Sequence, residues 1–273
     1  MVAFVAIISI ASCKKEIDWN AEPDPIVGVE VPVTKDPCEL TSFELYDAGS
    51  LEQNWVVFHN NSGLITTVAE GFYANNYTYS SDNIVITGSD NKQFDITLEN
   101  GRAIKIAALR GNYETYTYNS QGYISVIKLY SNSTLEKTTN LTYENGNLVR
   151  IEKSTVSSGT LEVTTLEYSS ELSNSNIRII KPWYQLVSDF FLPGNFYGKT
   201  SKNLITKATY IRTYNSNNFA FKETDVKNYT YTKDDKGNYN TVSIVKTNIA
   251  TANGMNISNE TYNLKYILYY YCN

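Results

Sequence analysis

The side chains that act as general bases in most hydrolases are scarce in this sequence. His59 is the only histidine, which excludes Ser-His-Asp and Cys-His relays unless this single residue serves them. It lies beside the polar stretch Asn60–Gly63, whose composition predicts a turn. We therefore expect His59 to be a solvated loop residue rather than a catalytic base.

Several short motifs resemble catalytic signatures, but the residues around them exclude the corresponding sites. Gly198–Thr200 matches the end of a phosphate-binding loop, but Pro193 replaces the glycine that such a loop requires upstream. Ser125–Lys128 and Ser243–Lys246 match Ser-x-x-Lys, yet residues three apart on a strand face opposite sides. No His, Cys or carboxylate cluster has zinc or calcium spacing. The sequence does not exclude the paired carboxylates of a glycosidase, because it does not show which Asp and Glu side chains lie close together in space. We therefore predict no enzyme, no metal and no cofactor.

Cys13 carries the clearest chemical signal. Residues 1–12 are apolar and uncharged, too short to span a bilayer but typical of the core of a signal peptide. Ile10-Ala11-Ser12-Cys13 resembles a lipobox, in which the cysteine thiol receives diacylglycerol after cleavage. Since no Lys or Arg precedes the apolar run, we expect the natural start to lie upstream of Met1. The sequence predicts a signal peptide over 1–12 and lipid attachment at Cys13.

A polar, proline-dotted stretch follows the cysteine. Residues 13–37 contain Pro23, Pro25, Pro32 and Pro37, a composition that favours an extended, semi-rigid tether. Acidic residues soon after Cys13 are similar to the surface-export signal of Bacteroidetes lipoproteins. We expect an outer-membrane lipoprotein, on the cell surface or on the periplasmic face.

Two further cysteines stand near the two ends of the remaining domain, residues 38–273. Cys38 and Cys272 lie in a chain expected in a compartment that permits disulfides. They either form a disulfide that joins the first strand to the last or remain two buried free thiols.

Composition predicts that this domain is made of strands. The chain has 23 Tyr, and Thr, Val and Ile are frequent, a mixture suited to a pleated sheet. Gly follows polar residues at Ser120–Gly122, Glu144–Gly146 and Asp235–Gly237, which predicts hairpins. The net charge is -5 and no basic stripe occurs, which argues against nucleic acid as a partner.

The strands and turns form a degenerate repeat in which Tyr-x-Tyr precedes a polar turn and an aliphatic strand. Because side chains alternate, each Tyr-x-Tyr places both rings on one face of the sheet. Cross-strand packing explains such rings sufficiently, at roughly 0.2–1 kcal/mol per pair. If instead they line a concave surface, they are candidate ligand-facing aromatics, together with one tryptophan: Tyr77, Tyr79, Tyr116, Tyr118, Tyr143, Tyr229, Tyr231 and Trp183.

One segment departs from the repeat. Between Pro182 and Pro193, Trp183, Leu186 and Phe190 fall at helical spacing. This predicts a short helix over 182–192, which either plugs the curved sheet or binds a partner, and we favour the plug.

These features resemble a known family. The lipobox, the repeated Tyr-x-Tyr hairpins and the segments 198–204 and 229–238 are similar to uncharacterised Bacteroidetes lipoproteins, a domain of unknown function with a porin-like fold. The hairpins also resemble the tyrosine-aspartate repeats of cell-surface shell proteins, with Asn or Glu usually replacing Asp. The resemblance covers about residues 40–273 and implies a long antiparallel up-and-down meander that forms an open or closed barrel. It implies no activity.

The sequence therefore predicts a porin-like but soluble barrel that is attached to a membrane by a lipid anchor. A membrane-spanning barrel would show a lipid-facing apolar band, whereas Asn140, Thr142 and Glu144 alternate with Leu141 and Tyr143. We expect a binding module for a glycan, lipid or peptide. The alternative is a structural or assembly partner of another outer-membrane protein, with no small ligand.

Overall fold

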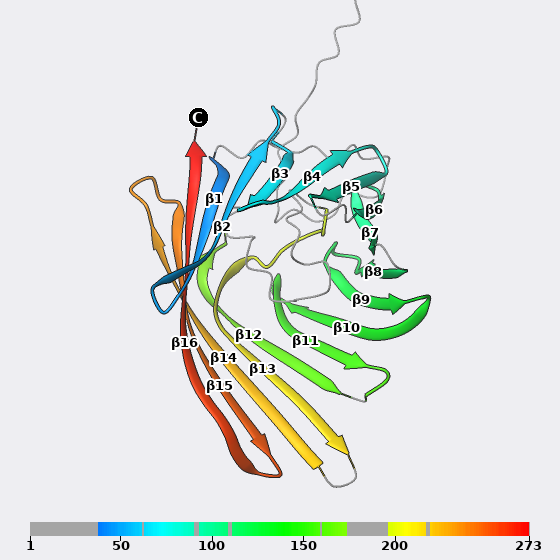
Figure 1. Ribbon diagram of the computed structural model, residues 1–273, viewed down its shortest axis with the longest axis vertical. Coiled ribbons are helices and arrows are strands. Elements are labelled where there is room, and N and C mark those ends of the chain that lie inside the picture. The colour runs from blue at the N-terminus through cyan, green and yellow to red at the C-terminus, as the bar shows by residue number, and fades with distance from the viewer. Residues whose placement is uncertain are drawn as a thin grey trace, which may run out of the picture.

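The computed structural model shows sixteen antiparallel β-strands that close into one barrel (Figure 1). It describes residues 38–61, 63–89, 93–108, 111–158, 160–173, 196–216 and 219–272. Each strand pairs with the strands before and after it in the chain. The predicted all-β up-and-down meander is confirmed, and of the two forms left open by the sequence the barrel takes the closed one.

The strand bounds show that the barrel is built from short strands first and long strands last. They are β1 (Cys38–Asp47), β2 (Ser50–His59), β3 (Ile65–Glu70), β4 (Tyr73–Tyr79), β5 (Asn83–Gly88), β6 (Gln93–Glu99), β7 (Arg102–Ala108), β8 (Asn112–Tyr118), β9 (Ile124–Ser131), β10 (Thr134–Glu144), β11 (Asn147–Thr155), β12 (Leu161–Leu172), β13 (Asn203–Ser216), β14 (Phe219–Lys233), β15 (Tyr239–Ala252) and β16 (Met255–Cys272).

Closure depends on the pairing of the first strand with the last. Phe43 of β1 lies opposite Leu268 of β16, and the same register places Cys38 opposite Cys272. The backbone therefore brings together the two cysteines that the sequence left as a disulfide or two thiols. Their bonding stays a prediction.

The hairpin turns follow from Asn-Gly pairs. Asn145 and Gly146 have φ of 51° and 81°, and Asn253 and Gly254 have φ of 48° and 79°. Two successive left-handed residues give the turn whose twist matches that of the flanking strands, and Asn and Gly adopt this conformation most easily. The turn predicted at Glu144–Gly146 is confirmed.

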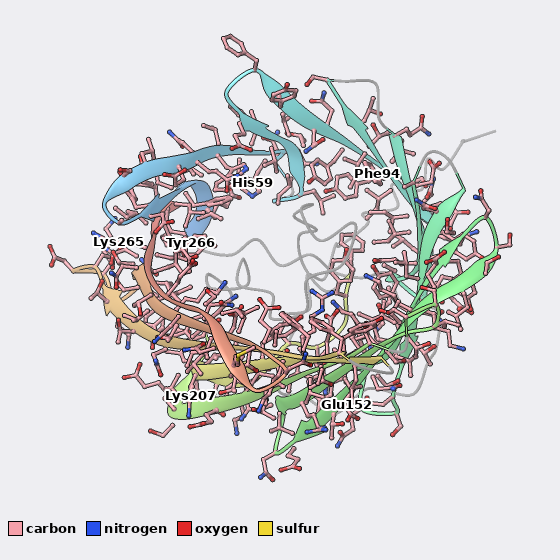
Figure 2. All side chains as sticks on the ribbon, turned by 60° about the horizontal axis from the view of Figure 1, so that its bottom comes forward. His59, Phe94, Glu152, Lys207, Lys265 and Tyr266 are labelled. Atoms are coloured by element: carbon pink, nitrogen blue, oxygen red, sulfur yellow. The ribbon has the colours of Figure 1, made fainter. Side chains whose placement is uncertain are left out.

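The hydrophobic core is the inner layer of the wall. Figure 2 shows Phe94 and Tyr266 on the inner side of the barrel, and Glu152, Lys207 and Lys265 on the outer side. The inward residues of β5–β9 are almost fully buried, with exposed fractions of 0–1% for Ile84, Ile86, Ile96, Ile106 and Ile127. Full burial of such a side chain contributes roughly 1.5–3 kcal/mol. Strand alternation thus puts the aliphatic face inside.

The described segment 196–202, which leads into β13, lies across the turns of neighbouring hairpins. The carbonyl of Phe196 accepts a hydrogen bond of 2.7 Å from the backbone N–H of Ala103. The N–H of Lys202 donates to the carbonyl of Gly146 at 2.9 Å. We call residues 196–202 the mouth segment, since it joins the ends of β6–β7 and β10–β11 on the side where β13 begins.

Some predictions fall outside the described residues. The helix over 182–192 with Trp183 does so, and so do the signal peptide 1–12 and the tether 13–37. In the part of the chain that the structure describes, no helix is long and apolar enough to cross a membrane.

The long strands extend the wall on one side only. β13–β16 have 14, 15, 14 and 18 residues, whereas β3–β8 have six or seven. In Figure 1 the four long strands reach well beyond the short ones at the bottom of the view. β1 pairs with β16 only from Leu264 to Cys272. Among the described residues, no strand pairs with Met255–Tyr262 on that edge of β16.

Candidate binding surface on the inner wall

The inner face of the long strands can be followed from Tyr266, which Figure 2 places inside the barrel. Since side chains alternate along a strand, Tyr262 and Glu260 share its face. The cross-strand register then sets Lys246 opposite Tyr262, and Lys227 opposite Lys246. Charged residues therefore point inward on this part of the wall, whereas most inward residues elsewhere in the barrel are aliphatic or aromatic.

We call the ionisable side chains on the inner face of β11–β16 the charged belt. Four are cationic and four are anionic, so their formal charges sum to zero. The members are Lys153, Glu162, Arg212, Glu223, Asp225, Lys227, Lys246 and Glu260.

One row of the belt alternates in sign across four strands. Lys153 of β11 lies opposite Glu162 of β12, with the Lys153 Nζ 3.2 Å from the Glu162 Oε2. Glu162 lies opposite Arg212, and Arg212 lies opposite Glu223. Opposite charges on facing residues contribute roughly 0.2–1 kcal/mol per pair. This row is electrostatically self-consistent and presents donors and acceptors in alternation.

The next row is tied together by an amide. Asn248 Nδ2 donates to Asp225 Oδ1 at 2.5 Å and to Glu223 Oε1 at 3.1 Å. Lys246 Nζ lies 3.1 Å from Asp225 Oδ2, and these two side chains are 26% and 14% exposed. The belt is therefore ordered by its own contacts and still open in part to solvent.

Partial burial shifts the pKa of two inner groups. Burial, and then the negative charges of Glu162 and Glu223, raise the pKa of Tyr210 well above its usual range. Burial, and then the positive charge of Lys246, lower the pKa of Lys227. Both shifts indicate poor hydration, and electrostatic contacts with a ligand are stronger in such an environment than in water.

The belt has the chemistry of a site for a hydroxyl-rich ligand. Carboxylates and an amide exchange hydrogen bonds with hydroxyl groups, while the rings of Tyr210 and Tyr262 offer flat apolar faces with a polar tip. The hydroxyl of Tyr262 itself donates to Glu260. Within the described ranges, no group of three or more His, Cys, Asp or Glu side chains is placed to hold a metal ion.

The tyrosines that the sequence offered as ligand-facing lie in the packed inner layer. Three of them are only 6–8% exposed, namely Tyr77, Tyr116 and Tyr229. Four more are partly buried and pack against the core: Tyr79, Tyr118, Tyr143 and Tyr231.

The tyrosine hydroxyls explain why the repeat uses Tyr rather than Phe. In four hairpins, the hydroxyl of a tyrosine near the end of one strand donates a hydrogen bond to a backbone carbonyl near the start of the preceding strand. The pairs are Tyr79 to Ile65 at 2.8 Å, Tyr118 to Ala103 at 2.8 Å, Tyr168 to Leu148 at 2.6 Å and Tyr231 to Ile205 at 2.8 Å. Buried carbonyls need such partners. The repeat is therefore explained by packing and hydrogen bonding, and we place the candidate surface on the charged belt.

The barrel is similar to a solved structure over most of its length. A porin-like protein from Bacteroides uniformis aligns with a TM-score of 0.59 and 20% identity, covering 84% of this chain and 96% of that chain. The fold is porin-like. The sequence matches no protein-family model and no curated protein. At this identity the similarity bears on the fold alone, so the resemblance to lipoproteins and to tyrosine-aspartate repeats stays a prediction.

The alternation on β10 differs from that of a barrel strand that faces lipid. On β10, Leu141 is buried inside, whereas Asn140 and Thr142 are exposed outside. Membrane-spanning barrels alternate apolar outside with polar inside. On β10 the alternation is therefore the reverse of that pattern.

Two residues that the sequence singled out, His59 and Cys13, do not belong to the belt. His59 is the last residue of β2 and points into the barrel (Figure 2), so the expectation of a loop residue is wrong. The pairing of His59 with Ile65 of β3 extends the ladder up to the residue before the turn. Cys13 lies outside the described residues.

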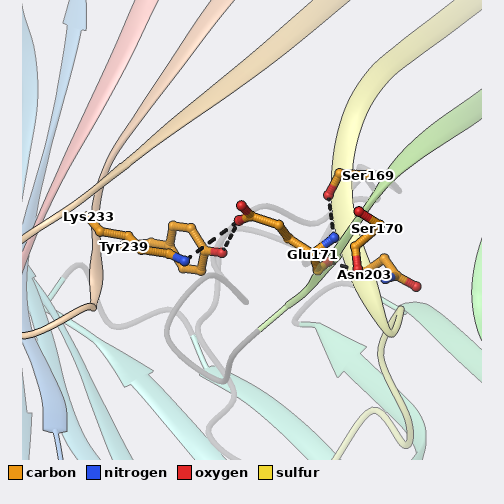
Figure 3. A network of polar contacts seen from close by, with 6 residues as sticks. All are labelled: Ser169, Ser170, Glu171, Asn203, Lys233 and Tyr239. Atoms are coloured by element: carbon orange, nitrogen blue, oxygen red, sulfur yellow. Dashed lines mark hydrogen bonds and ion pairs between the residues drawn. The ribbon is translucent and has the colours of Figure 1, made fainter.

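A polar network ties the end of β12 to the β14–β15 hairpin at the mouth (Figure 3). The hydroxyl of Tyr239 donates to Glu171 Oε2 at 2.5 Å, and Lys233 Nζ lies 3.7 Å from the same oxygen. The hydrogen bond from Tyr239, and then the charge of Lys233, lower the pKa of Glu171. Asn203 Nδ2 donates to the carbonyls of Ser170 and Glu171 at 3.2 Å each. The strand that precedes the mouth segment is therefore held from two sides.

The sequence reasoning did not single out the charged belt. A signal was available, because Glu223, Asp225 and Lys227 occupy one strand face and are followed on that face by Tyr229. The missing information was the lateral order of the strands. Only the register shows that Lys246 lies beside Lys227.

Proposed function

We propose that this chain is a lipid-anchored cell-envelope protein whose barrel binds a glycan at the charged belt, without turnover. Of the glycan, lipid and peptide ligands expected from the sequence, a glycan fits the belt best. Charged groups of both signs, an amide and tyrosine rings suit a hydroxyl-rich molecule. A lipid chain would bring apolar groups against ionised ones, which is unfavourable.

The observation that carries this proposal is the change in the inner wall. Over β4–β10 the inner face is largely aliphatic and aromatic, with Glu114 as a buried exception, whereas over β11–β16 the inner face carries the charged belt beside its apolar residues. Ionised groups contribute little to a core, because their desolvation offsets their attraction. Their concentration on one inner surface therefore supports a role in recognition.

The anchor and the location rest on the sequence and on the fold. The lipobox at Cys13 and the tether over 13–37 support lipid attachment, and the porin-like fold is compatible with an envelope location. Labelling of cells with a clickable palmitate analogue should mark the native chain and leave Cys13→Ser unmarked. Equal labelling of both chains would contradict the anchor.

The binding proposal is tested with a glycan array and matched variants. Arg212→Gln and Glu223→Gln remove charges from the belt, while Lys207→Gln removes one from the outer face. Hits of the native chain should be lost or weakened in both belt variants and kept in Lys207→Gln. Circular dichroism confirms that each variant is folded. An array without hits, or hits that ignore the belt variants, would contradict glycan binding in the barrel.

One observation favours the alternative of an assembly partner. The edge of β16 from Met255 to Tyr262 has no pairing strand among the described residues, and a free edge accepts an extended strand from another protein. A strand of a neighbouring outer-membrane protein would add there. The carbonyl of Asn263 accepts from Ala48 beyond the end of β1, so the backbone of Asn259, four positions earlier, faces the same edge. Asn259→Pro removes a backbone donor from this edge and should abolish photo-crosslinking from position 261, whereas unchanged crosslinks would exclude the edge.

A further inference from the structure

Two lysines face each other on the inner wall. Lys227 of β14 and Lys246 of β15 are directly opposite in the register, so their Cβ atoms are about 4.5–5.5 Å apart. Like charges directly opposite one another destabilise a sheet. A barrel built only for stability gains nothing from this pair, which makes it a candidate for a role in binding.

The nearby carboxylates are already engaged. Asp225 pairs with Lys246 at 3.1 Å and also accepts from the amide of Asn248. Glu260 accepts from the hydroxyl of Tyr262. Lys227 forms no ion pair with any residue that the structure describes. The negative charge that acts on the Lys227 ammonium group is Asp225, two positions away on the same strand face, and this carboxylate is already paired with Lys246.

The position of the second lysine is fixed by an aromatic ring. Lys246 Nζ lies 5.4 Å from the ring centre of Tyr262, within the range of a cation–π contact. Asp225 holds the same ammonium group from the other strand. Lys246 is therefore pre-positioned beside Lys227, and a group that reaches one can reach both.

We propose that Lys227 and Lys246 form a subsite for the carboxylate of an acidic glycan, such as a uronic acid residue. This inference rests on the proposed function and adds the ligand class. The carboxylate oxygens accept from the ammonium group of Lys227, which has no ion pair among the described residues, and from Lys246, which keeps Asp225. The remaining sugar hydroxyls contact the neutral part of the belt around Asn248.

The test compares two sugars that differ in their carboxylates. Calorimetric titrations of the full chain use trigalacturonate and its neutral counterpart galactotriose. The variants are Lys227→Met and Lys246→Met, which keep the length of the side chain, and Lys227→Arg, which keeps the charge. Lys222→Met is the matched control, since it removes a lysine from the outer face of the same strand.

We expect trigalacturonate to bind at least tenfold more tightly than galactotriose, and more weakly as salt increases. Each Met variant should lose about tenfold or more for trigalacturonate only, while Lys227→Arg and Lys222→Met bind as the native chain does. Equal binding of both sugars, unaffected by the Met variants, would overturn the acidic subsite and leave glycan binding intact. Absence of binding for both sugars would overturn the subsite together with glycan binding at the belt.

Discussion

Alkaline pH should unfold this barrel cooperatively, because its inner layer is rich in buried tyrosines. Burial raises the pKa of Tyr168 and of Tyr229 to about 12, against 10 in the unfolded chain. It also raises the pKa of Tyr79, Tyr143 and Tyr231 well above the usual range. A raised pKa means that the folded state holds its proton more tightly. The stabilising contribution is complete below pH 10 and is lost as the pH rises further.

The size of the effect follows from linkage. At pH 12 a tyrosine with a folded pKa of about 12 and an unfolded pKa of about 10 costs the fold roughly 2 kcal/mol. A tyrosine with a still higher folded pKa costs about 2.7 kcal/mol at that pH, since one pH unit is worth about 1.36 kcal/mol. The groups named above together cost about 12 kcal/mol, which is comparable to the whole stability of a typical domain of about 5–15 kcal/mol.

The assay follows two signals through one titration from neutral pH to pH 12. Tyrosinate absorbance reports ionisation, and circular dichroism reports the β-sheet. The two should change together in one steep transition above pH 10, with inner tyrosines ionising only as the sheet is lost. Gradual ionisation of all tyrosines with the β signal intact at pH 12 would refute the assignment of these rings to a dry inner layer.

Three substitutions or treatments test other parts of the fold. Cys38 and Cys272 should resist alkylation until a reductant is added, and reduction should lower the free energy of unfolding by about 5 kcal/mol because the disulfide closes a long loop. Two alkylatable thiols in the native chain would contradict the disulfide. Gly198→Ala should lower the free energy of unfolding, measured in urea, by more than about 1 kcal/mol, because φ is 73° there and an added Cβ would press on the Gly122 carbonyl and lie 2.9 Å from the Tyr118 ring. An unchanged urea midpoint would contradict this packing. Tyr118→Phe should lower the free energy of unfolding by about 1–2 kcal/mol in the same assay, because the Ala103 carbonyl loses the hydroxyl that donates to it. The control Tyr113→Phe, on the outer face, should leave the stability unchanged, and equal effects of the two variants would contradict the role of the inner hydroxyl.

The strand order was readable from the sequence because local signals agree with the global fold. Asn145-Gly146 gives a tight turn, and alternation on either side of it gives two strands that must pair. Repeating this unit along the chain leaves only a meander. Leu141 and Tyr143 on one face, against Asn140 and Thr142 on the other, even indicated which face is polar.

The candidate site was not readable, because it depends on pairings between strands. Lys227 and Lys246 are 19 positions apart in the sequence and become neighbours only through the β14–β15 register. For Tyr118 and Tyr231 the sequence left two interpretations open, packing in the sheet or facing a ligand. Their hydroxyls donate to carbonyls of the preceding strands. A ring on a strand can pack or bind, and only its neighbours decide which.

The uneven strand lengths link this fold to the proposed site. A barrel of sixteen strands is too wide for wall side chains alone to fill, which is why porins of similar size leave an aqueous channel. Near the mouth, the described segment 196–202 adds Phe196 to the buried inner layer. The long ends of β13–β16 extend beyond the short strands, so less wall stands opposite them (Figure 1). An inner surface with little to pack against stays open in part to solvent and must be polar to be stable, and this is where the charged belt lies. The stagger of the strands therefore creates the surface, and the lysines on β14 and β15 give it a preference among ligands.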